Sequence, residues 1–291
     1  MSDKKSARLI LEDGTTFTGY SFGAETATTG EVGFNTAMTG YPESLTDPSY
    51  SGQILVSTYQ LVGNYGVPQK ESEYGLLKFF ESDRIHVKGL VISDYSFEYS
   101  HWNAVESLGD WLKREQIPGI TGIDTRELTK VLREHGVMMG KIVFENEELR
   151  MKNEEFPSYS DINYVDQVSC KEIIHYFPSG TSSHSAANSS FFIPHSSLKK
   201  VVLVDCGVKT NIIRCLLKRN VEVIRVPWDY DYNGFEFDGL FISNGPGDPD
   251  TCDAAVQNIR KAMSNEKLPI FGICMGNQLL SKAGGAKIYK L

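Results

Sequence analysis

Apolar runs alternate with amphipathic stretches over the last third of the chain. The apolar runs lie at 201–204, 223–226, 240–242 and 270–273, and the stretches with helical spacing lie at about 211–217, 254–263 and 276–283. Strands that are apolar along their whole length and that alternate with helices predict a parallel sheet covered on both faces. We therefore expect residues 199–291 to form a doubly wound α/β domain.

The first 150 residues have a different pattern, with short strands and frequent turn signals. Apolar residues on both sides of Asp13 and Gly14 predict a hairpin with a type I′ turn, because this dipeptide tolerates the positive φ angles of that turn. We expect residues 1–150 to form a compact α+β domain.

Two helices are predicted within this domain. Residues 103–115 have Val105, Leu108, Trp111 and Leu112 at the spacing of one helix face. A second helix is capped by Asp124 or Thr125 and ends near Gly136.

The segment 151–198 joins the two predicted domains. It has eight serines between residues 179 and 197, mixed with proline, glycine and asparagine. Such a composition buries little apolar surface and is typical of a flexible linker.

Composition narrows the class of protein. The 291 residues contain 29 basic and 37 acidic side chains, a net charge of −8, whereas nucleic-acid-binding proteins usually have a basic excess. No apolar stretch approaches the roughly 20 residues of a membrane span, and no secretory signal is apparent, so we expect a cytoplasmic protein. The five cysteines form no C-x-x-C pair, which argues against disulfides and a metal site.

Cys274 is the strongest candidate for chemistry. It is the centre of G-I-C-M-G at 272–276, at a predicted junction between a strand and a helix. This pattern is typical of a nucleophile elbow, and a helix N-terminus favours the thiolate. The alternative is a small buried apolar residue, which is the usual place of a free cysteine; the flanking glycines favour the nucleophile.

A second candidate segment is S-N-G-P-G-D-P at 243–249, directly after a predicted strand. Ligands of open α/β sheets bind outside the carboxyl ends of the strands, where glycines let backbone N–H groups approach a developing oxyanion. The same residues are also common in ordinary turns, so this segment indicates a binding loop only in combination with the predicted elbow.

Together these segments resemble a known family. G-I-C-M-G-N-Q at 272–278 and the 243–249 segment are similar to the nucleophile and oxyanion segments of class I glutamine amidotransferases, which have a flavodoxin-like fold. Motifs of the first half resemble the small, glutaminase component of carbamoyl-phosphate synthase; they lie at 11–15, 30–32, 38–43, 45–50, 63–66 and 122–126.

The resemblance implies that the chain hydrolyses glutamine and delivers ammonia to a synthetase component, separate or fused, which makes carbamoyl phosphate from bicarbonate and ATP. Cys274 matches the nucleophile that forms a γ-glutamyl thioester. The matching substrate-binding positions are Met275 through its backbone N–H, Gly245, Gly247, Gln278 and Ser49. From the residues alone, Ser49 reads as a turn cap beside Pro48. The chain itself is expected to need no cofactor or metal, since ATP and Mg²⁺ belong to the synthetase component.

The chain departs from the family at two points. Asn277 replaces a usual histidine, as in urea-type carbamoyl-phosphate synthases, some of which use free ammonia. The family's catalytic histidine and glutamate follow the nucleophile, whereas all six histidines here precede Cys274. We therefore expect an incomplete amidotransferase domain, truncated near Leu291 with an exposed apolar sheet edge after residues 287–289, and little glutaminase activity from residues 1–291 alone.

Two alternatives to the glutaminase stay open. One is a degenerate, non-catalytic module that binds or regulates the synthetase component, and the other is a different cysteine-elbow hydrolase. The sequence also leaves open whether the product serves pyrimidine, arginine or urea synthesis.

Overall fold

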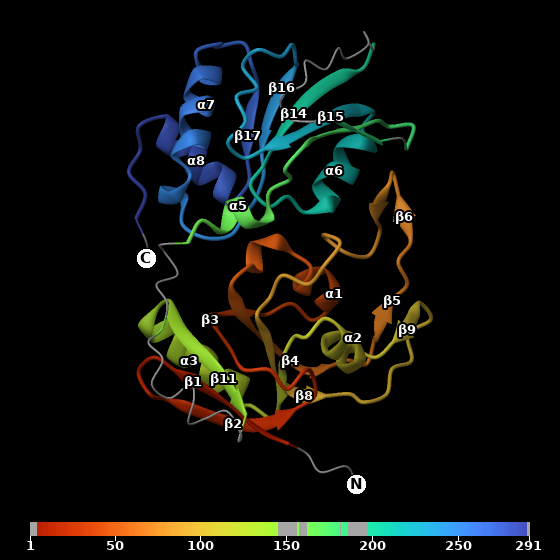
Figure 1. Ribbon diagram of the computed structural model, residues 1–291, viewed down its shortest axis with the longest axis vertical. Coiled ribbons are helices and arrows are strands. Elements are labelled where there is room, and N and C mark those ends of the chain that lie inside the picture. Colours follow the sequence, from red (N-terminus) through yellow and green to blue (C-terminus); the bar gives the residue numbers. More distant parts are fainter. Residues whose placement is uncertain (1–4, 145–155, 157–161, 181, 186–196, 290–291) are drawn as a thin grey trace. The chain divides into compact units, whose positions relative to one another are not determined.

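The computed structural model describes residues 5–144, 156, 162–180, 182–185 and 197–289 (Figure 1). The chain divides into two compact units, and each is described by itself. Unit 1 comprises residues 1–46, 50–69 and 84–159, and unit 2 comprises residues 47–49, 70–83 and 160–291. The predicted division near residue 150 thus differs from the units in two segments of the first half, 47–49 and 70–83, which belong to unit 2.

Unit 1 contains a closed barrel formed by described strands in the order β1-β11-β3-β4-β8-β10-β2. Their bounds are β1 Ser6–Leu11, β2 Thr16–Ser21, β3 Thr28–Asn35, β4 Gln53–Val62, β8 Gly89–Tyr95, β10 Gly119–Thr121 and β11 Met138–Phe144. Neighbours from β3 to β10 pair in parallel, and the other pairs are antiparallel. Alternate residues of β1 are buried (Ala7, Leu9 and Leu11), so one face of the strand lies in the barrel core.

The predicted hairpin of β1 and β2 is confirmed, but the predicted turn type is wrong. The Gly14 N–H donates to Leu11 O at 2.9 Å, and the Leu11 N–H donates to Thr15 O at 2.9 Å. Gly14 has a φ of 88°, whereas Asp13 is not among the residues with positive φ. Asp13 Oδ1 instead accepts the Thr15 N–H at 2.8 Å, which holds a three-residue loop with one left-handed glycine.

The two predicted helices of unit 1 have different outcomes. Helix α3 (Thr125–His135) is confirmed, with Asp124 as its cap and Gly136 after its end. Helix α2 is Leu108–Arg114, so its predicted start at residue 103 is wrong. Ser107 has an extended backbone and its side chain accepts the Asp110 N–H, which sets the start of the helix there. Val105 is 58% exposed and lies in strand β9.

Short elements complete unit 1. They are helix α1 Tyr41–Leu45 and the paired strands β5 Val67–Pro68 and β9 Ala104–Glu106. The single-turn helix η1 spans Pro48–Tyr50, so its first two residues belong to unit 2.

Unit 2 contains a sheet whose described strands follow the order β13-β12-β15-β14-β16-β17. The strands are β12 Ile173–Tyr176, β13 Ser182–Ser185, β14 Lys199–Asp205, β15 Val221–Pro227, β16 Gly239–Ile242 and β17 Ile270–Gly272. The last four are parallel to one another, β12 pairs antiparallel with β15, and β13 pairs antiparallel with β12. No described strand follows β17, and Phe271 on this edge strand is 60% exposed.

Helices cover both faces of this sheet (Figure 1). Helix α6 (Thr210–Leu217) covers one face, and α7 (Asp253–Met263) and α8 (Met275–Ala283) cover the other; α5 (Tyr164–Val168) and the single turn η3 (Pro249–Thr251) are the remaining helical elements described in this unit. Val202 and Val204 of β14 pack with residues of α7 and α8, whereas Leu203 between them packs with residues of α6. Alternate residues of one strand thus pack into the cores on opposite faces of the sheet, which confirms the predicted doubly wound α/β fold.

The predicted linker 151–198 is partly folded. Helix α5 and strands β12 and β13 lie inside this range, and β12 pairs with β15. The most serine-rich part, 186–196, lies outside the described residues. The prediction was wrong for the folded part because Tyr164, Val165 and Ile173 supply buried apolar surface that the serine count did not weigh.

The segment 70–83 of unit 2 packs beside α6. It contains the hairpin of β6 (Ser72–Glu73) and β7 (Leu76–Leu77), and Leu76 is buried in the core on the α6 side. Arg214 donates to Leu77 O, and Thr210 Oγ1 donates to Phe80 O at 2.8 Å. These bonds explain why a segment from the first half of the chain belongs to the second unit.

Replacing the α3 cap tests the local account of unit 1. Asp124→Ala removes the acceptor of the Arg126 and Glu127 N–H groups, and we expect it to lower the free energy of unfolding by about 1 kcal/mol in urea titrations. Glu134→Ala, an exposed change near the other end of the same helix, is the control and should have almost no effect. Equal effects of the two variants would contradict the capping role.

Candidate active site

Cys274 lies between β17 and α8, as predicted for a nucleophile elbow. Its backbone has φ 51° and ψ −111°, a conformation that is strained for a residue with a side chain. Its thiol side chain is exposed, whereas Cys206 and Cys252 are buried. The turn therefore presents this cysteine to solvent at the first turn of a helix.

Two glycines make this turn possible. A Cβ at Gly276 would overlap the carbonyl oxygen of Ile242 at the end of β16, and a Cβ at Gly272 would lie 2.5 Å from the Gly276 backbone. The Gly276 N–H donates to Ser243 O at 3.0 Å. The elbow is thus held directly against the loop that follows β16.

The 243–249 loop is fixed at several points. The Cys206 N–H donates to Ser243 Oγ at 2.9 Å, which joins the loop to the residue after β14. A Cβ at Gly245 would overlap the carbonyl oxygen of Cys206, and Gly247 has a φ of 80°. Each glycine therefore meets a requirement of the backbone, as expected for a loop whose peptide groups approach a ligand closely.

The helix residues after Cys274 present two further candidates. Met275 is the first residue of α8, where the backbone N–H has no acceptor within the helix. Gln278 is half-buried one turn later, and its N–H donates to Cys274 O at 3.1 Å. A carbonyl placed at the thiol would thus lie beside a free helix N-terminus, which stabilises negative charge on oxygen.

Ser49 belongs to unit 2, although it comes from the first half of the chain. Its Oγ accepts from Asn244 Nδ2 at 2.8 Å, and its N–H donates to Asp47 Oδ1 at 2.9 Å. Asp47 in turn pairs with Lys209 at 2.7 Å. The turn is capped by Asp47, so the hydroxyl of Ser49 is not used as the cap.

The structure therefore collects all six residues singled out from the sequence in one unit: Gly245 and Gly247 in the loop after β16, Cys274 after β17, Met275 and Gln278 at the start of α8, and Ser49 in η1. The link from the elbow to Ser49 passes through Ser243 and Asn244. Sequence reasoning missed Asn244 as a contact of Ser49; its position next to the glycines of the loop was the available signal.

Sequence reasoning also missed a buried ion pair at the end of β14. Asp205 is fully buried and pairs with Arg225 at 2.6 Å. It also accepts the backbone N–H groups of Cys170, Gly207 and Val208. Burial alone would raise the pKa of Asp205, but the guanidinium and the three N–H groups together hold it below its usual value. The ionised carboxylate thus shapes the backbone that leads to Lys209.

Among the histidines of unit 2, the structure describes the side chain of His175, which lies in the middle of a strand and not on the loops around Cys274. His175 lies on β12 opposite Ile224, in the middle of β15. Burial lowers the pKa of His175. Asn277 is exposed in the first turn of α8.

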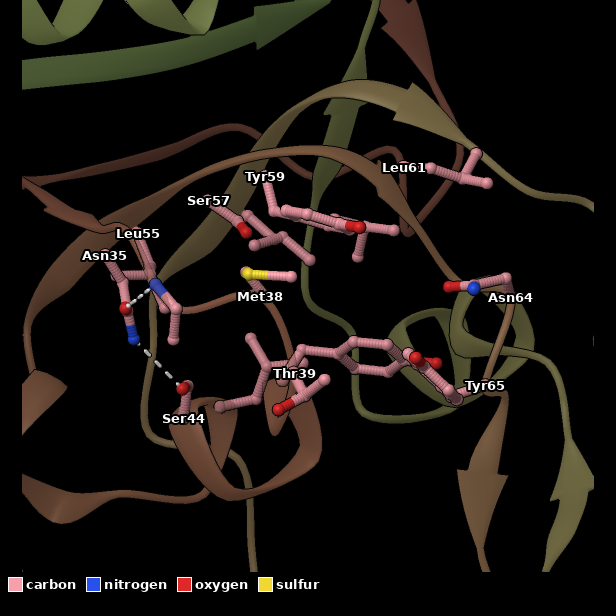
Figure 2. A pocket seen from close by; sticks show the side chains of 15 residues that line it. Asn35, Met38, Thr39, Ser44, Leu55, Ser57, Tyr59, Leu61, Asn64 and Tyr65 are labelled. Carbon is pink, nitrogen blue, oxygen red and sulfur yellow. Dashed lines mark hydrogen bonds between the residues drawn. The ribbon is translucent and has the colours of Figure 1, made fainter. Parts of the chain in front are cut away.

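Unit 1 has a separate pocket (Figure 2). Figure 2 shows Met38, Tyr59 and Tyr65 around the hollow, with Asn35 bonded to Ser44 at its side at 3.1 Å. Tyr41 also lines it, and its hydroxyl donates to Gly66 O at 2.6 Å. None of the candidate site residues lines this pocket.

The described residues lack two features of other classes of protein. They contain no cluster of three or more His, Cys, Asp or Glu side chains arranged to hold a metal ion. They also contain no helix with the length and apolar character needed to cross a membrane.

Comparison with known proteins matches both halves of the chain. Residues 9–142 match the family described as carbamoyl-phosphate synthase small chain, CPSase domain, and residues 202–291 match glutamine amidotransferase class-I. The arginine-specific carbamoyl phosphate synthase small chain of Saccharomyces cerevisiae is 46% identical, over 98% of this chain and 67% of that protein.

Two longer relatives are also similar. The multifunctional protein CAD of Squalus acanthias is 49% identical, over 98% of this chain and 12% of that protein. The human mitochondrial carbamoyl-phosphate synthase [ammonia] is 43% identical, over 99% of this chain and 18% of that protein. This chain thus spans less than a fifth of these two relatives.

Apart from the first residues of β14, the parallel part of the doubly wound sheet lies with its cysteine elbow and glycine loop within residues 202–291, the region that matches glutamine amidotransferase class-I, so this part of the chain is of that class. With the first half matched as well, the chain belongs to the carbamoyl-phosphate synthase small-chain family.

Replacing Asp205 tests the buried ion pair. Asp205→Asn leaves Arg225 without its charge partner, and we expect a loss of about 3–5 kcal/mol in the free energy of unfolding at pH 7. Because the folded pKa of Asp205 is lowered, its stabilisation is present above the unfolded pKa of about 3.9 and is lost as pH falls through the folded value. The difference between wild type and variant should therefore narrow below about pH 4.

Urea titrations from pH 2 to pH 7 measure this difference. Asp238→Asn is the control, because Asp238 also has a lowered pKa and pairs with Lys199, but at the exposed surface. It should cost at most about 1 kcal/mol. A difference for Asp205→Asn that stays constant with pH would contradict the account.

Proposed function

We propose that this chain is the glutaminase component of carbamoyl-phosphate synthase, which hydrolyses glutamine at Cys274 and supplies ammonia to a synthetase component. The observation that carries the proposal is the exposed thiol of Cys274 in a strained turn at the N-terminus of α8. The family supports the same reaction, since its matched region includes a glutamine amidotransferase class-I domain.

The reaction begins when the Cys274 thiol loses its proton to a base and Sγ attacks the γ-carbonyl carbon of glutamine. The oxyanion that forms is stabilised by the Met275 N–H and by backbone N–H groups of the loop that contains Gly245 and Gly247. The carbon–nitrogen bond then breaks, and ammonia leaves with the proton returned by the base. Water hydrolyses the γ-glutamyl thioester to glutamate and restores the thiol.

Recognition of the rest of glutamine is assigned to Ser49 and Gln278. Gln278 lies in the first turn of α8, directly after the elbow, and Ser49 is joined to the loop after β16 through Asn244. We assign the base to no residue of the described chain.

The ammonia is proposed to react in a synthetase component that forms carbamoyl phosphate from bicarbonate and ATP. ATP and Mg²⁺ are expected to act there and not in this chain. Two of the named relatives support this arrangement, because one is a synthase small chain and the other, CAD, is a longer multifunctional protein. The five free cysteines support a cytoplasmic location, where thiols stay reduced.

A second candidate function is a non-catalytic module that binds or regulates the synthetase. Asn277 in place of the family's usual histidine favours this candidate, as does the similarity to an ammonia-type synthase. Glutamine hydrolysis that depends on Cys274 would exclude it.

Glutamate release from glutamine tests the proposed function in the protein expressed from its complete gene. We expect Cys274→Ser to lower turnover to background, a loss of roughly 10⁴-fold or more, because the hydroxyl is a far weaker nucleophile than a thiolate. Cys215→Ser is the matched control, since Cys215 is also exposed but lies on α6. Turnover that survives in Cys274→Ser, or no turnover in the wild type, would contradict the proposal.

A further inference from the structure

Asn244 is a buried polar side chain at the proposed site to which the mechanism gives no task. It is 2% exposed and directly follows β16 and Ser243. Its Nδ2 donates to Ser49 Oγ and to Gly207 O, both at 2.8 Å, and its Oδ1 accepts the Lys209 N–H at 3.2 Å.

These partners fix the orientation of the amide. Gly207 O can only accept a hydrogen bond and the Lys209 N–H can only donate one. A flipped amide would place its oxygen against Gly207 O and its NH₂ against the Lys209 N–H, which loses both bonds. The atom that faces Ser49 is therefore the donor Nδ2.

The orientation of Asn244 decides what the Ser49 hydroxyl can do. A hydroxyl has one hydrogen and two lone pairs, and Asn244 uses a lone pair. The hydrogen stays available, and among the described residues no acceptor is recorded for it. Ser49 is only half-buried, so a ligand can supply this acceptor.

The backbone of Ser49 is held as firmly as its hydroxyl. Its N–H donates to Asp47 Oδ1, and the Asp47 carboxylate, whose side chain is 5% exposed, pairs with Lys209. The side chain and the backbone of Ser49 are thus both anchored to loops of the parallel sheet.

We propose that Asn244 is a positioning residue that fixes the Ser49 hydroxyl as a hydrogen-bond donor, so that this part of the site recognises the α-carboxylate of glutamine. The inference rests on the proposed function. The open hydrogen of the Ser49 hydroxyl needs an acceptor, and the acceptors of glutamine are its α-carboxylate and its amide oxygen, because the ammonium and the amide NH₂ are donors. The amide oxygen is already assigned to the Met275 N–H, which leaves the carboxylate.

The test compares two alkylating probes of Cys274 in the protein expressed from its complete gene. The chloroketone analogue of L-glutamine carries the α-carboxylate, and its chloride is displaced by the thiolate with formation of a sulfur–carbon bond. Iodoacetamide reacts with the same thiolate but has no carboxylate. The measured quantity is the ratio of the two labelling rates at Cys274, resolved by peptide mass spectrometry, with the exposed Cys215 as an internal reference.

Asn244→Asp keeps the shape of the side chain but replaces the donor by an acceptor, which captures the Ser49 hydrogen. We expect the rate ratio to fall about ten- to hundredfold, the effect of losing a hydrogen bond to a charged group, while the iodoacetamide rate stays within about twofold. Asn244→Ser adds no buried charge and removes the donor that orients the Ser49 hydroxyl, so it should also lower the ratio; it replaces the first variant if that variant does not fold.

Matched variants separate positioning from general damage. Ser49→Ala should lower the ratio of labelling rates as Asn244→Asp does. Ser49→Thr, which keeps a hydroxyl, should have a ratio close to that of the wild type. The double variant Asn244→Asp/Ser49→Ala should lose no more than either single one, because both act through one hydrogen bond. Asn265→Asp, an exposed change after α7, should leave the ratio unchanged.

The outcomes distinguish a failure of the proposed function from a failure of the positioning role of Asn244. A wild-type ratio at Cys274 no higher than that at Cys215 would overturn the proposed function itself. A high wild-type ratio that persists in both Asn244 variants would overturn the positioning role and leave the glutaminase proposal intact.

Discussion

The close approach of helix α8 to strand β16 is the constraint on which the site depends. Gly276 has no side chain because the carbonyl oxygen of Ile242 occupies the place of a Cβ, and its N–H donates to Ser243 O. The chain must therefore turn from β17 into α8 within very few residues, and Cys274 takes the positive φ that this turn demands. Strain at this residue is stored in the backbone and held by the packed elements on both sides.

Buried polar bonds extend this constraint across the edge of the sheet. Asp205 orders the backbone after β14, and Asn244 joins the loop after β16 to both Gly207 and Ser49. Such groups lie in a medium of low dielectric constant, where a missing partner is costly, so the network permits few alternative arrangements. The site is thus formed by short, glycine-rich loops without regular secondary structure, and shared hydrogen bonds hold these loops in place.

The regular elements could be predicted because their signals are local. The apolar runs of β14, β15 and β16 and the cap and glycine stop of α3 are complete in the sequence itself. Three predictions were wrong: the turn type of the hairpin, the start of α2 and the unfolded character of the whole linker. In the first two, hydrogen bonds to the side chains of Asp13 and Ser107 set the local structure, and in the third, burial of Ile173 does so; composition contains neither kind of contact. Cys274 could be found from its flanking glycines, whereas the contact of Asn244 with Ser49 joins positions 195 residues apart.

The central claim is that Cys274 attacks the γ-carbonyl of glutamine, and the covalent intermediate tests it most directly. The protein expressed from its complete gene is mixed with isotopically labelled glutamine, quenched in acid and digested, and each cysteine-containing peptide is weighed by mass spectrometry. The account predicts one γ-glutamyl group on the peptide that contains Cys274, labile to hydroxylamine and absent in Cys274→Ser. Release of labelled glutamate with no adduct on this peptide, or with an adduct on another residue, would contradict it.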